Sequence, residues 1–396
     1  MQREQETAKK ANDHDRDLVI VSRTQARIAR LPEYKKGCGV NAMGDVRCSA
    51  RLDLTESGST RVTMPISHQE YRDFPMLAAQ SVYDYILCGW KTHSSIALTG
   101  LTTTVAVGTP DITIHMASGP SPISRGANRF STKGVILDHS NERSLIGVRD
   151  IADFEISEGK EIRIWPSAAK AHKDIEIFLL GLVWGTLCHQ RGTFPLHASA
   201  ISTPGGITAF AGHSGSGKST TAALMDSLGF GLIADDILPV SFYQGSLPGA
   251  WPYLRRLKLQ RDAILEFSLV PKESVGEELD KEKFFVGSQQ NVLDEWRRLE
   301  RLYVLEIDPT VSTARIDRIN GAEAIRVLID QTYHYRFIVG CSKFREHLES
   351  CVQLASKLPI YRLRRAPSHV LSRELGSLIC EHLKEVSKSR ERAALN

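Results

Sequence analysis

The alternation of apolar and polar side chains predicts a β-rich region in the first half of the chain. Residues 111–116 alternate with a period of two, which favours a strand that buries one face. Residues 154–157 and 161–165 are two further strand-like runs, and Glu158-Gly159-Lys160 between them predicts a hairpin turn. We therefore expect a small β-rich domain over residues 81–170. The face of the first strand expected to be buried consists of Ile112, Ile114 and Met116.

A helical period follows between about residues 172 and 190. We interpret its apolar stripe as a packing surface, and the stripe consists of Ile175, Phe178, Leu179, Leu182, Val183, Thr186 and Leu187. Residues 271–290 are charged and predict a surface loop, with a lid or an acceptor-docking loop as the alternative. Further patterns predict helical pieces over 291–302, 321–333 and 343–358, strands over 303–307 and 359–363, and a last helix.

The most specific local signal is the run Gly212-His213-Ser214-Gly215-Ser216-Gly217-Lys218-Ser219. It matches the phosphate-binding pattern G-x-x-x-x-G-K-[ST] at every fixed position. Residues 207–211 predict a buried strand before it, and residues 220–228 predict a helix after it, which is the context that the pattern needs. The expected nucleotide-binding residues are Gly212, His213, Ser214, Gly215, Ser216, Gly217, Lys218, Ser219 and Thr220.

An acidic pair follows the loop closely. Asp235 and Asp236 end the apolar run 232–234, and ligands of open α/β sheets bind beyond the carboxyl ends of the strands. If this strand lies beside the strand before the loop, both carboxylates face bound phosphates. One could bind Mg²⁺ and the other could orient or deprotonate a hydroxyl. The alternative is a solvated turn, since Asp favours turns.

A histidine lies upstream on a related segment. Residues 196–202 predict a strand, and residues 203–206 predict the turn of a hairpin whose second strand leads into the loop. His197 is therefore expected near the phosphates. A structural role for this side chain is about as plausible as a catalytic one.

These segments together resemble the core of HPr kinase/phosphorylase-like proteins, whose fold is related to phosphoenolpyruvate carboxykinase. The resemblance covers residues 175–260 most strongly, and extends over 80–175 and 300–383. It implies an α/β fold, with a P-loop kinase core of mixed sheet and flanking helices over 171–383. The sequence resembles most the branch of peptide serine kinases that modify lasso-peptide precursors, because we find no counterpart of the Glu-centred metal stretch or of the phosphorylase motif of true HPr kinase/phosphorylases.

The resemblance also implies roles for single residues. Lys218 would bind phosphates, and Ser219 and Asp236 would serve the metal. Asp235 would be the base for the acceptor hydroxyl, and His197 would contact the phosphoryl region. A basic cluster within the similar stretch 248–259 supplies candidate substrate or phosphate contacts, with a solvated edge as the alternative. This cluster consists of Arg255, Arg256 and Lys258.

Composition narrows the class of protein. The 396 residues carry a formal net charge of +4, which argues against a dedicated nucleic-acid binder. The longest apolar helical run, 175–188, is too short for a membrane span of roughly 20 residues, and the N-terminus has no apolar signal core, so we expect a cytoplasmic protein without a membrane partner. The seven cysteines are scattered and predict no zinc or disulfide framework.

Residues 1–80, with strand-like pieces such as 18–21, predict a polar, partly flexible extension, and residues 384–396 predict a basic tail.

The sequence therefore predicts an ATP- and Mg²⁺-dependent kinase. Its expected acceptor is a Ser or Thr hydroxyl of a peptide or protein, and a lasso-peptide precursor is one candidate. Two alternatives stay open, namely a nucleotide-binding regulatory module without transfer activity and a kinase for a small hydroxylated metabolite. The resemblance also allows another phosphate donor and a homo-oligomer.

Overall fold

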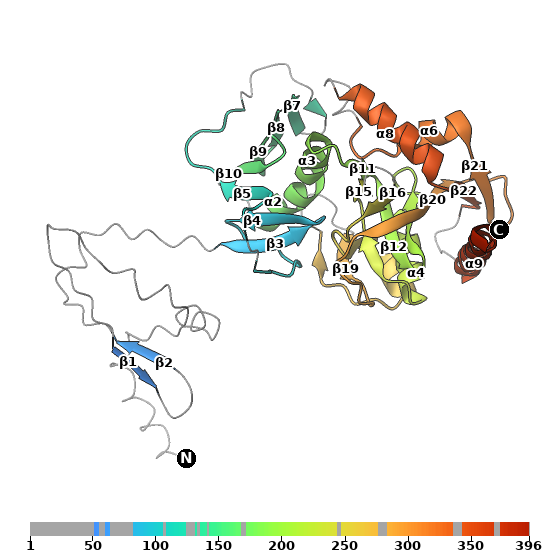
Figure 1. Cartoon of the computed structure of the whole chain (residues 1–396), viewed down its shortest axis with the longest axis horizontal. Coiled ribbons are helices and arrows are strands. Elements are labelled where there is room, and N and C mark those ends of the chain that lie inside the picture. The colour runs from blue at the N-terminus through green and yellow to red at the C-terminus, as the bar shows by residue number, and fades with distance from the viewer. Residues whose placement is uncertain are drawn as a thin grey trace, which may run out of the picture. The chain divides into compact units, whose positions relative to one another are not determined.

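The computed structural model describes residues 51–54, 60–63, 82–105, 108–123, 131–132, 135–140, 142–167, 172–243, 247–275, 283–335, 343–367 and 373–395. The strand-like piece at 18–21 lies outside these residues. The chain forms two compact units, residues 1–79 and residues 80–396. In the first unit, β1 (Arg51–Leu54) and β2 (Thr60–Thr63) pair antiparallel. All elements that follow belong to the second unit (Figure 1).

An eight-stranded sheet opens the second unit. Its strand order is β3-β4-β5-β10-β9-β8-β7-β6, with β3 (Tyr83–Leu87), β4 (Trp90–Ser94), β5 (Ile112–Met116), β6 (Ser131–Thr132), β7 (Val135–His139), β8 (Arg143–Val148), β9 (Ala152–Ser157) and β10 (Glu161–Pro166). The predicted hairpin is confirmed, because β9 and β10 pair antiparallel. Glu158 and Gly159 turn the chain with positive φ angles. Ile112 and Ile114 are fully buried as predicted, whereas Met116 is half-buried.

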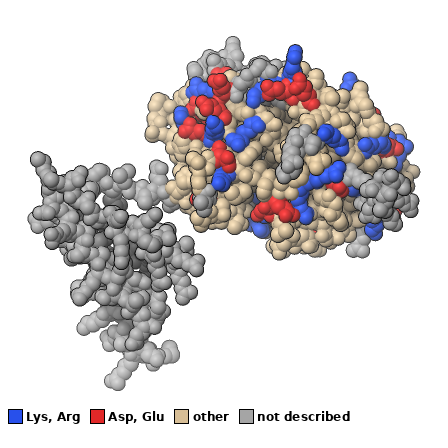
Figure 2. Space-filling view, in the orientation of Figure 1, with Lys and Arg blue, Asp and Glu red and all other residues tan. Residues whose placement is uncertain are grey.

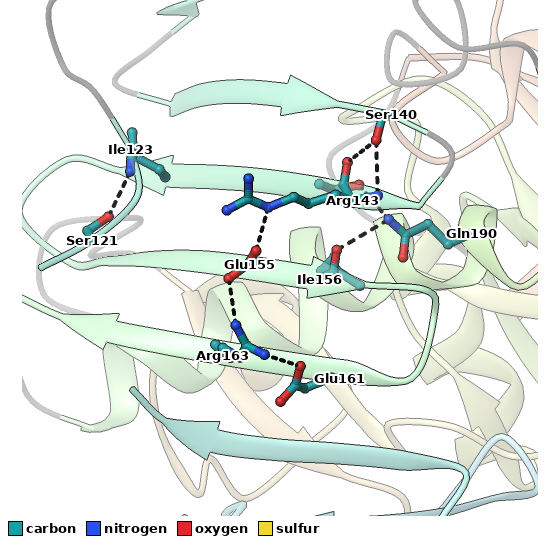
Figure 3. A network of polar contacts seen from close by, with 10 residues as sticks. Ser121, Ile123, Ser140, Arg143, Glu155, Ile156, Glu161, Arg163 and Gln190 are labelled. Atoms are coloured by element: carbon teal, nitrogen blue, oxygen red, sulfur yellow. Dashed lines mark hydrogen bonds and ion pairs between the residues drawn. The ribbon is translucent and has the colours of Figure 1, made fainter. Parts of the chain in front are cut away.

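An ion-pair ladder crosses three strands of this sheet. Figure 3 shows Glu155 on β9 between Arg143 on β8 and Arg163 on β10. Arg163 also pairs with Glu161 at 2.7 Å. Each charge in the ladder therefore has a fixed partner of opposite sign on its own or a neighbouring strand.

The predicted helix at 172–190 is confirmed, with a π-helical turn in its middle. It consists of α2 (His172–Phe178), the π-helical segment η3 (Leu179–Val183) and α3 (Trp184–Gln190). Every residue of η3 and α3 is buried, so protein surrounds this part of the helix on all sides. Core residues of both large sheets belong to the same hydrophobic cluster as this helix, so it joins the two sheets.

A nine-stranded mixed sheet forms the rest of the framework. Its order is β11-β15-β16-β20-β13-β12-β14, and β22 pairs with β20 and β21. The strands are β11 (Phe194–Leu196), β12 (Ala198–Thr203), β13 (Gly206–Ala211), β14 (Leu232–Ala234), β15 (Leu238–Tyr243), β16 (Leu247–Ala250), β20 (Arg297–Ile307), β21 (Arg315–Ile319) and β22 (Ile360–Arg365). A separate three-stranded sheet has the order β17-β19-β18, with β17 (Arg256–Gln260), β18 (Glu273–Ser274) and β19 (Lys283–Gly287).

Helices cover both faces of the nine-stranded sheet. α4 (Lys218–Ser227) and α9 (Arg373–Leu395) share one hydrophobic cluster with it, and α6 (Gly321–Asp330) and α8 (Phe344–Lys357) share another. α5 (Arg261–Glu266) follows β17. The predicted α/β class is confirmed as a mixed α/β fold. The predicted domain boundary near residue 170 stays a prediction.

Several sequence-based expectations for single elements were wrong. Residues 291–302 are not helical, because β20 begins at Arg297 and buries side chains on both faces of the sheet. Residues 271–290 are more than a surface loop, since they include β18 and β19, although residues 276–282 lie outside the described residues. The predicted basic tail from residue 384 is not contradicted, and α9 continues through it as far as Leu395.

The surface charge is mixed. Figure 2 shows Lys and Arg side chains interspersed with Asp and Glu on the face drawn. No helix in the described part of the chain combines the length and the apolarity that a membrane crossing requires.

Candidate active site

The glycine loop, residues 212–219, joins β13 to α4 as the sequence predicted. A side chain at Gly212 would clash, since its Cβ would lie 2.6 Å from Ser216 Oγ and 2.7 Å from the carbonyl oxygen of Leu305. Gly212, Gly215 and Gly217 all have positive φ angles, and Gly217 directly precedes the helix at φ +97°. The loop therefore takes a backbone path that residues with a Cβ avoid, and it ends at a helix N-terminus, which attracts anions.

The Lys218 ammonium lies over the first residues of this loop. Its Nζ donates to the carbonyl oxygens of Gly212 at 2.9 Å and His213 at 3.4 Å. Burial lowers the pKa of Lys218, and the carboxylates of Asp236 and Asp235 oppose that shift. A desolvated ammonium held in this position is suited to the β- and γ-phosphates of a nucleotide.

The loop also contains an unsatisfied hydroxyl. Within the described residues, the buried Oγ of Ser216 has no hydrogen-bond partner. A buried polar atom without a partner is costly, so this hydroxyl is suited to an additional acceptor or donor group. Together with the neighbouring loop amides and Lys218, it gives the residues of the loop a good fit to a phosphate group.

The acidic strand β14 is not the direct neighbour of β13, so the condition set in the sequence analysis is not met. β12 lies between them and pairs antiparallel with both β13 and β14. β13 and β14 therefore run parallel to each other, and their carboxyl ends meet at one edge of the sheet. Asp235 and Asp236 still reach the loop, because an intervening antiparallel strand preserves the direction of its two neighbours.

Asp235 is buried and accepts hydrogen bonds from three neutral donors. Ser199 and Ser219 donate their hydroxyls to its Oδ1 at 2.6 Å and 2.8 Å. The main-chain N–H of Lys258 donates to its Oδ2 at 2.9 Å. The structure thus brings the loop serine to Asp235, whereas the sequence prediction paired it with Asp236 at the metal.

Asp236 is half-exposed and contacts charged or titratable side chains. Its Oδ2 lies 3.1 Å from Lys258 Nζ, and its Oδ1 lies 3.5 Å from His197 Nδ1. Burial favours the neutral acid, but Lys258 and His197 outweigh it and hold the pKa of Asp236 below its ordinary value. Its backbone φ of +74° is unusual for a residue other than glycine.

His197 lies between β11 and β12 rather than inside one continuous strand as predicted. Its main-chain N–H donates to Gln331 O at 2.8 Å, which draws the chain away from a regular strand. Its Nδ1 lies 2.9 Å from the carbonyl oxygen of Asp236, which can only accept, so Nδ1 carries the proton. Burial and the nearby Lys218 lower the pKa of His197 and favour the neutral ring.

The basic cluster separates in the fold. Lys258 lies at the site, bonded to both aspartates as described above. Arg255 instead pairs with Asp294 at 3.0 Å. Arg256 pairs with Glu176 on α2 at 3.0 Å. The structure therefore brings one of the three predicted contacts to the aspartates and places the two arginines in ion pairs elsewhere.

Sequence analysis missed two side chains that contact the loop. Gln331 Oε1 accepts the N–H of Gly212 at 2.8 Å. Arg365, which is buried, donates to Ser216 O at 3.2 Å, and burial lowers the pKa of its guanidinium. Because β22 runs parallel to β20, and β20 to β13, the end of the predicted strand 359–363 could have suggested the arginine. Gln331 follows a helix and gave no such signal.

Oxygen ligands for a metal are present, but not as a closed cage. In the part of the chain that the structure describes, no group of three or more His, Cys, Asp and Glu side chains is arranged to hold a metal ion. Mg²⁺ is commonly bound through one or two carboxylates together with water and substrate phosphates. The carboxylate of Asp235 and the hydroxyl of Ser219 fit that kind of site.

Comparisons with known proteins add little to this geometry. No protein-family model and no curated protein matches the sequence. Among solved structures, the fold is similar to the HPr(Ser) kinase/phosphatase from Coxiella burnetii, at 11% sequence identity and a TM-score of 0.26. That match covers 51% of this chain and 98% of the other. We therefore infer function from the geometry of the site.

Proposed function

We propose that this protein is a kinase that transfers the γ-phosphoryl group of ATP to a Ser or Thr hydroxyl of a peptide or protein. The observation that carries the proposal is the convergence of the glycine loop, Lys218 and the two aspartates at one edge of the sheet. One half of this arrangement suits a phosphate donor. The other half offers a carboxylate to a hydroxyl acceptor.

The donor half acts by positioning and by charge. The loop amides, the Ser216 hydroxyl and the Lys218 ammonium would bind the phosphates. The Arg365 guanidinium donates a hydrogen bond to the main-chain carbonyl of Ser216 and so helps to fix the loop. Such preorganised donors stabilise the charge that develops on the transferred group, which is the main catalytic contribution in phosphoryl transfer.

Asp235 and Ser219 are the residues that would hold Mg²⁺. When bound, the metal would neutralise the charge of the β- and γ-phosphates. The hydroxyls that now donate to Asp235 can rotate, which leaves the carboxylate able to accept a cation. This assignment reverses the roles that the sequence suggested for the two aspartates.

Asp236 is the candidate general base. Its carboxylate is ionised at neutral pH, and its half-exposed position lets an acceptor reach it. As the acceptor oxygen bonds to the γ-phosphorus, the bond from that phosphorus to the bridging oxygen of ADP breaks. The hydroxyl proton passes to the Asp236 carboxylate, and the neutral His197 holds that residue through its carbonyl.

Transfer of label from γ-labelled ATP tests the proposal. The full chain is incubated with ATP, Mg²⁺ and a library of Ser- and Thr-containing peptides, beside Lys218→Ala. We expect labelled peptides with the parent only. If the parent binds ATP but labels neither peptides nor hydroxylated metabolites, the nucleotide-binding module replaces the kinase. Label on metabolites alone would identify a small-molecule kinase.

A further inference from the structure

A cavity of about 850 Å³ adjoins the glycine loop on the side of α6. The end of β20, the middle of β22 and one face of α6 form its walls. The residues that matter for its chemistry are Gly212, His213, Glu306, Arg326, Asp330 and Gln331. Its volume lies in the range of pockets for ligands of roughly 300–1,000 Å³, so it can hold several residues of an extended peptide.

The contacts of Lys218 indicate which end of the donor faces this cavity. A loop lysine of this kind reaches the β- and γ-phosphates. The Lys218 ammonium lies 2.9 Å from Gly212 O and 3.4 Å from His213 O, and both of these residues line the cavity. The γ-phosphate end of a bound nucleotide would therefore lie at the edge of the cavity.

Gln331 connects the cavity to the proposed base. Its side chain accepts the N–H of Gly212, and its main-chain carbonyl accepts the N–H of His197. His197 in turn contacts Asp236. The wall of the cavity and the proposed base are thus linked through Gln331 and His197.

The wall of the cavity carries two kinds of charge. Arg362 neutralises Glu306 and Glu323, at 2.8 Å and 2.7 Å. Arg326 and Asp330 are exposed, and within the described residues neither side chain forms an ion pair or a hydrogen bond. They lie one turn apart on α6. A cation and an anion are therefore both available to a ligand.

The position of Asp330 is unfavourable for the helix itself. It is the last residue of α6, where the helix dipole disfavours a carboxylate. Arg326 precedes it by four residues, which is the less favourable order for a helical pair of opposite charge. Natural proteins break such local rules at functional sites, and a ligand that binds both charges would account for this exception.

Resting on the proposed function, we propose that this cavity binds the acceptor as a peptide segment with charges of both signs beside its hydroxyl residue. An acidic side chain of the segment pairs with Arg326, and a basic one pairs with Asp330. The cavity thereby selects which hydroxyl receives the phosphoryl group.

Exchanging the two charges tests this assignment. The double variant Arg326→Asp with Asp330→Arg keeps the net charge and gives α6 the favourable charge order, so loss of folding is not expected. The matched control exchanges Arg345 and Glu349, an exposed pair at the same spacing on α8 outside the cavity. Each protein is incubated with γ-labelled ATP, Mg²⁺ and two serine-peptide libraries whose flanking Glu and Lys stand in opposite orders. ATP affinity is measured in parallel by calorimetry.

We expect the parent and the α8 control to prefer one library by about tenfold, and the α6 variant to prefer the other, with ATP affinity unchanged. Unchanged preference in the α6 variant would overturn the assignment. A tenfold loss of ATP affinity in that variant would also overturn it, because the cavity would then hold the nucleoside. If the parent binds ATP but labels neither library, the peptide acceptor is refuted, whereas a parent that does not bind ATP refutes the proposed function itself.

Discussion

Two buried carboxylates, one in each large sheet, are held by different kinds of partner. Glu155 in the eight-stranded sheet lies between the guanidinium groups of Arg143 and Arg163 (Figure 3). Asp235 at the edge of the nine-stranded sheet is held by two hydroxyls and one main-chain N–H. Both side chains are almost fully buried, so burial alone does not distinguish them.

The difference lies in whether the negative charge is already compensated. Two permanent cations neutralise Glu155, so no uncompensated negative charge is left there for a ligand to bind. The donors to Asp235 are neutral, so its charge can still be used by a cation brought with a substrate. We infer that the first carboxylate stabilises structure and the second serves chemistry.

Lys218→Ala should have the largest effect. Removing the ammonium leaves the phosphates without their only proposed cation from the loop, and transfer should fall on the order of 10³-fold. Label transfer from ATP measures the loss. Lys272→Ala, at an exposed lysine, is the control and should keep the rate of the parent. Equal losses in both variants would show that the loop is not the donor site.

Asp236→Asn should lower the transfer rate by about 10²-fold, since an amide cannot accept the proton. ATP affinity should stay close to that of the parent, because Ser219 of the loop bonds to Asp235 and not to Asp236. Single-turnover rates and calorimetry separate the two effects. A rate equal to that of the parent would remove Asp236 from the chemistry.

Lys258→Met should change the pH dependence of transfer through Asp236 and leave the hydrogen bonds of Asp235 in place. The variant keeps the main-chain N–H that bonds Asp235 and removes the ammonium that holds the pKa of Asp236 below its ordinary value. The pKa of Asp236 then rises. Since only the ionised base accepts a proton, the acid limb of the pH–rate profile should move to higher pH. A limb at the position of the parent would contradict this role of Lys258.

Glu155→Gln should have the smallest effect and no effect on transfer. The two arginines lose a charged partner, but their side chains are 52% and 42% exposed and can be solvated. The free energy of unfolding should therefore fall by about 1–2 kcal/mol. Urea denaturation measures it, with Glu158→Gln at an exposed turn as the control. A large loss of transfer in folded Glu155→Gln would contradict the inference that Glu155 serves structure alone.

The sequence predicted the parts of the fold that local periodicity determines. The β9–β10 hairpin, the helix at 172–190 and the path from β13 through the glycine loop to α4 follow from residue patterns within short windows. The position of β12 between β13 and β14 did not follow, because strand order depends on packing between distant segments. β20 was partly misread for the same reason, since a central strand buried on both faces loses its alternation.

The site was predictable where a motif fixes the backbone and less so where tertiary contacts decide. The sequence identified Lys218, Ser219 and both aspartates, but their hydrogen-bond partners depend on where β12 and β17 lie. Gln331 and Arg365 come from segments more than 110 residues after the loop's start. No local pattern around them indicates that they contact it.

Magnesium-dependent binding of ATP tests the central claim most directly. Calorimetry with and without Mg²⁺ is carried out on the parent, Ser219→Ala and Asp235→Asn, with thermal unfolding as a check on folding. We expect that Mg²⁺ tightens ATP binding to the parent and that folded Asp235→Asn loses this gain. A parent whose ATP affinity is the same with and without Mg²⁺, or an Asp235→Asn variant that keeps the full gain, would contradict it.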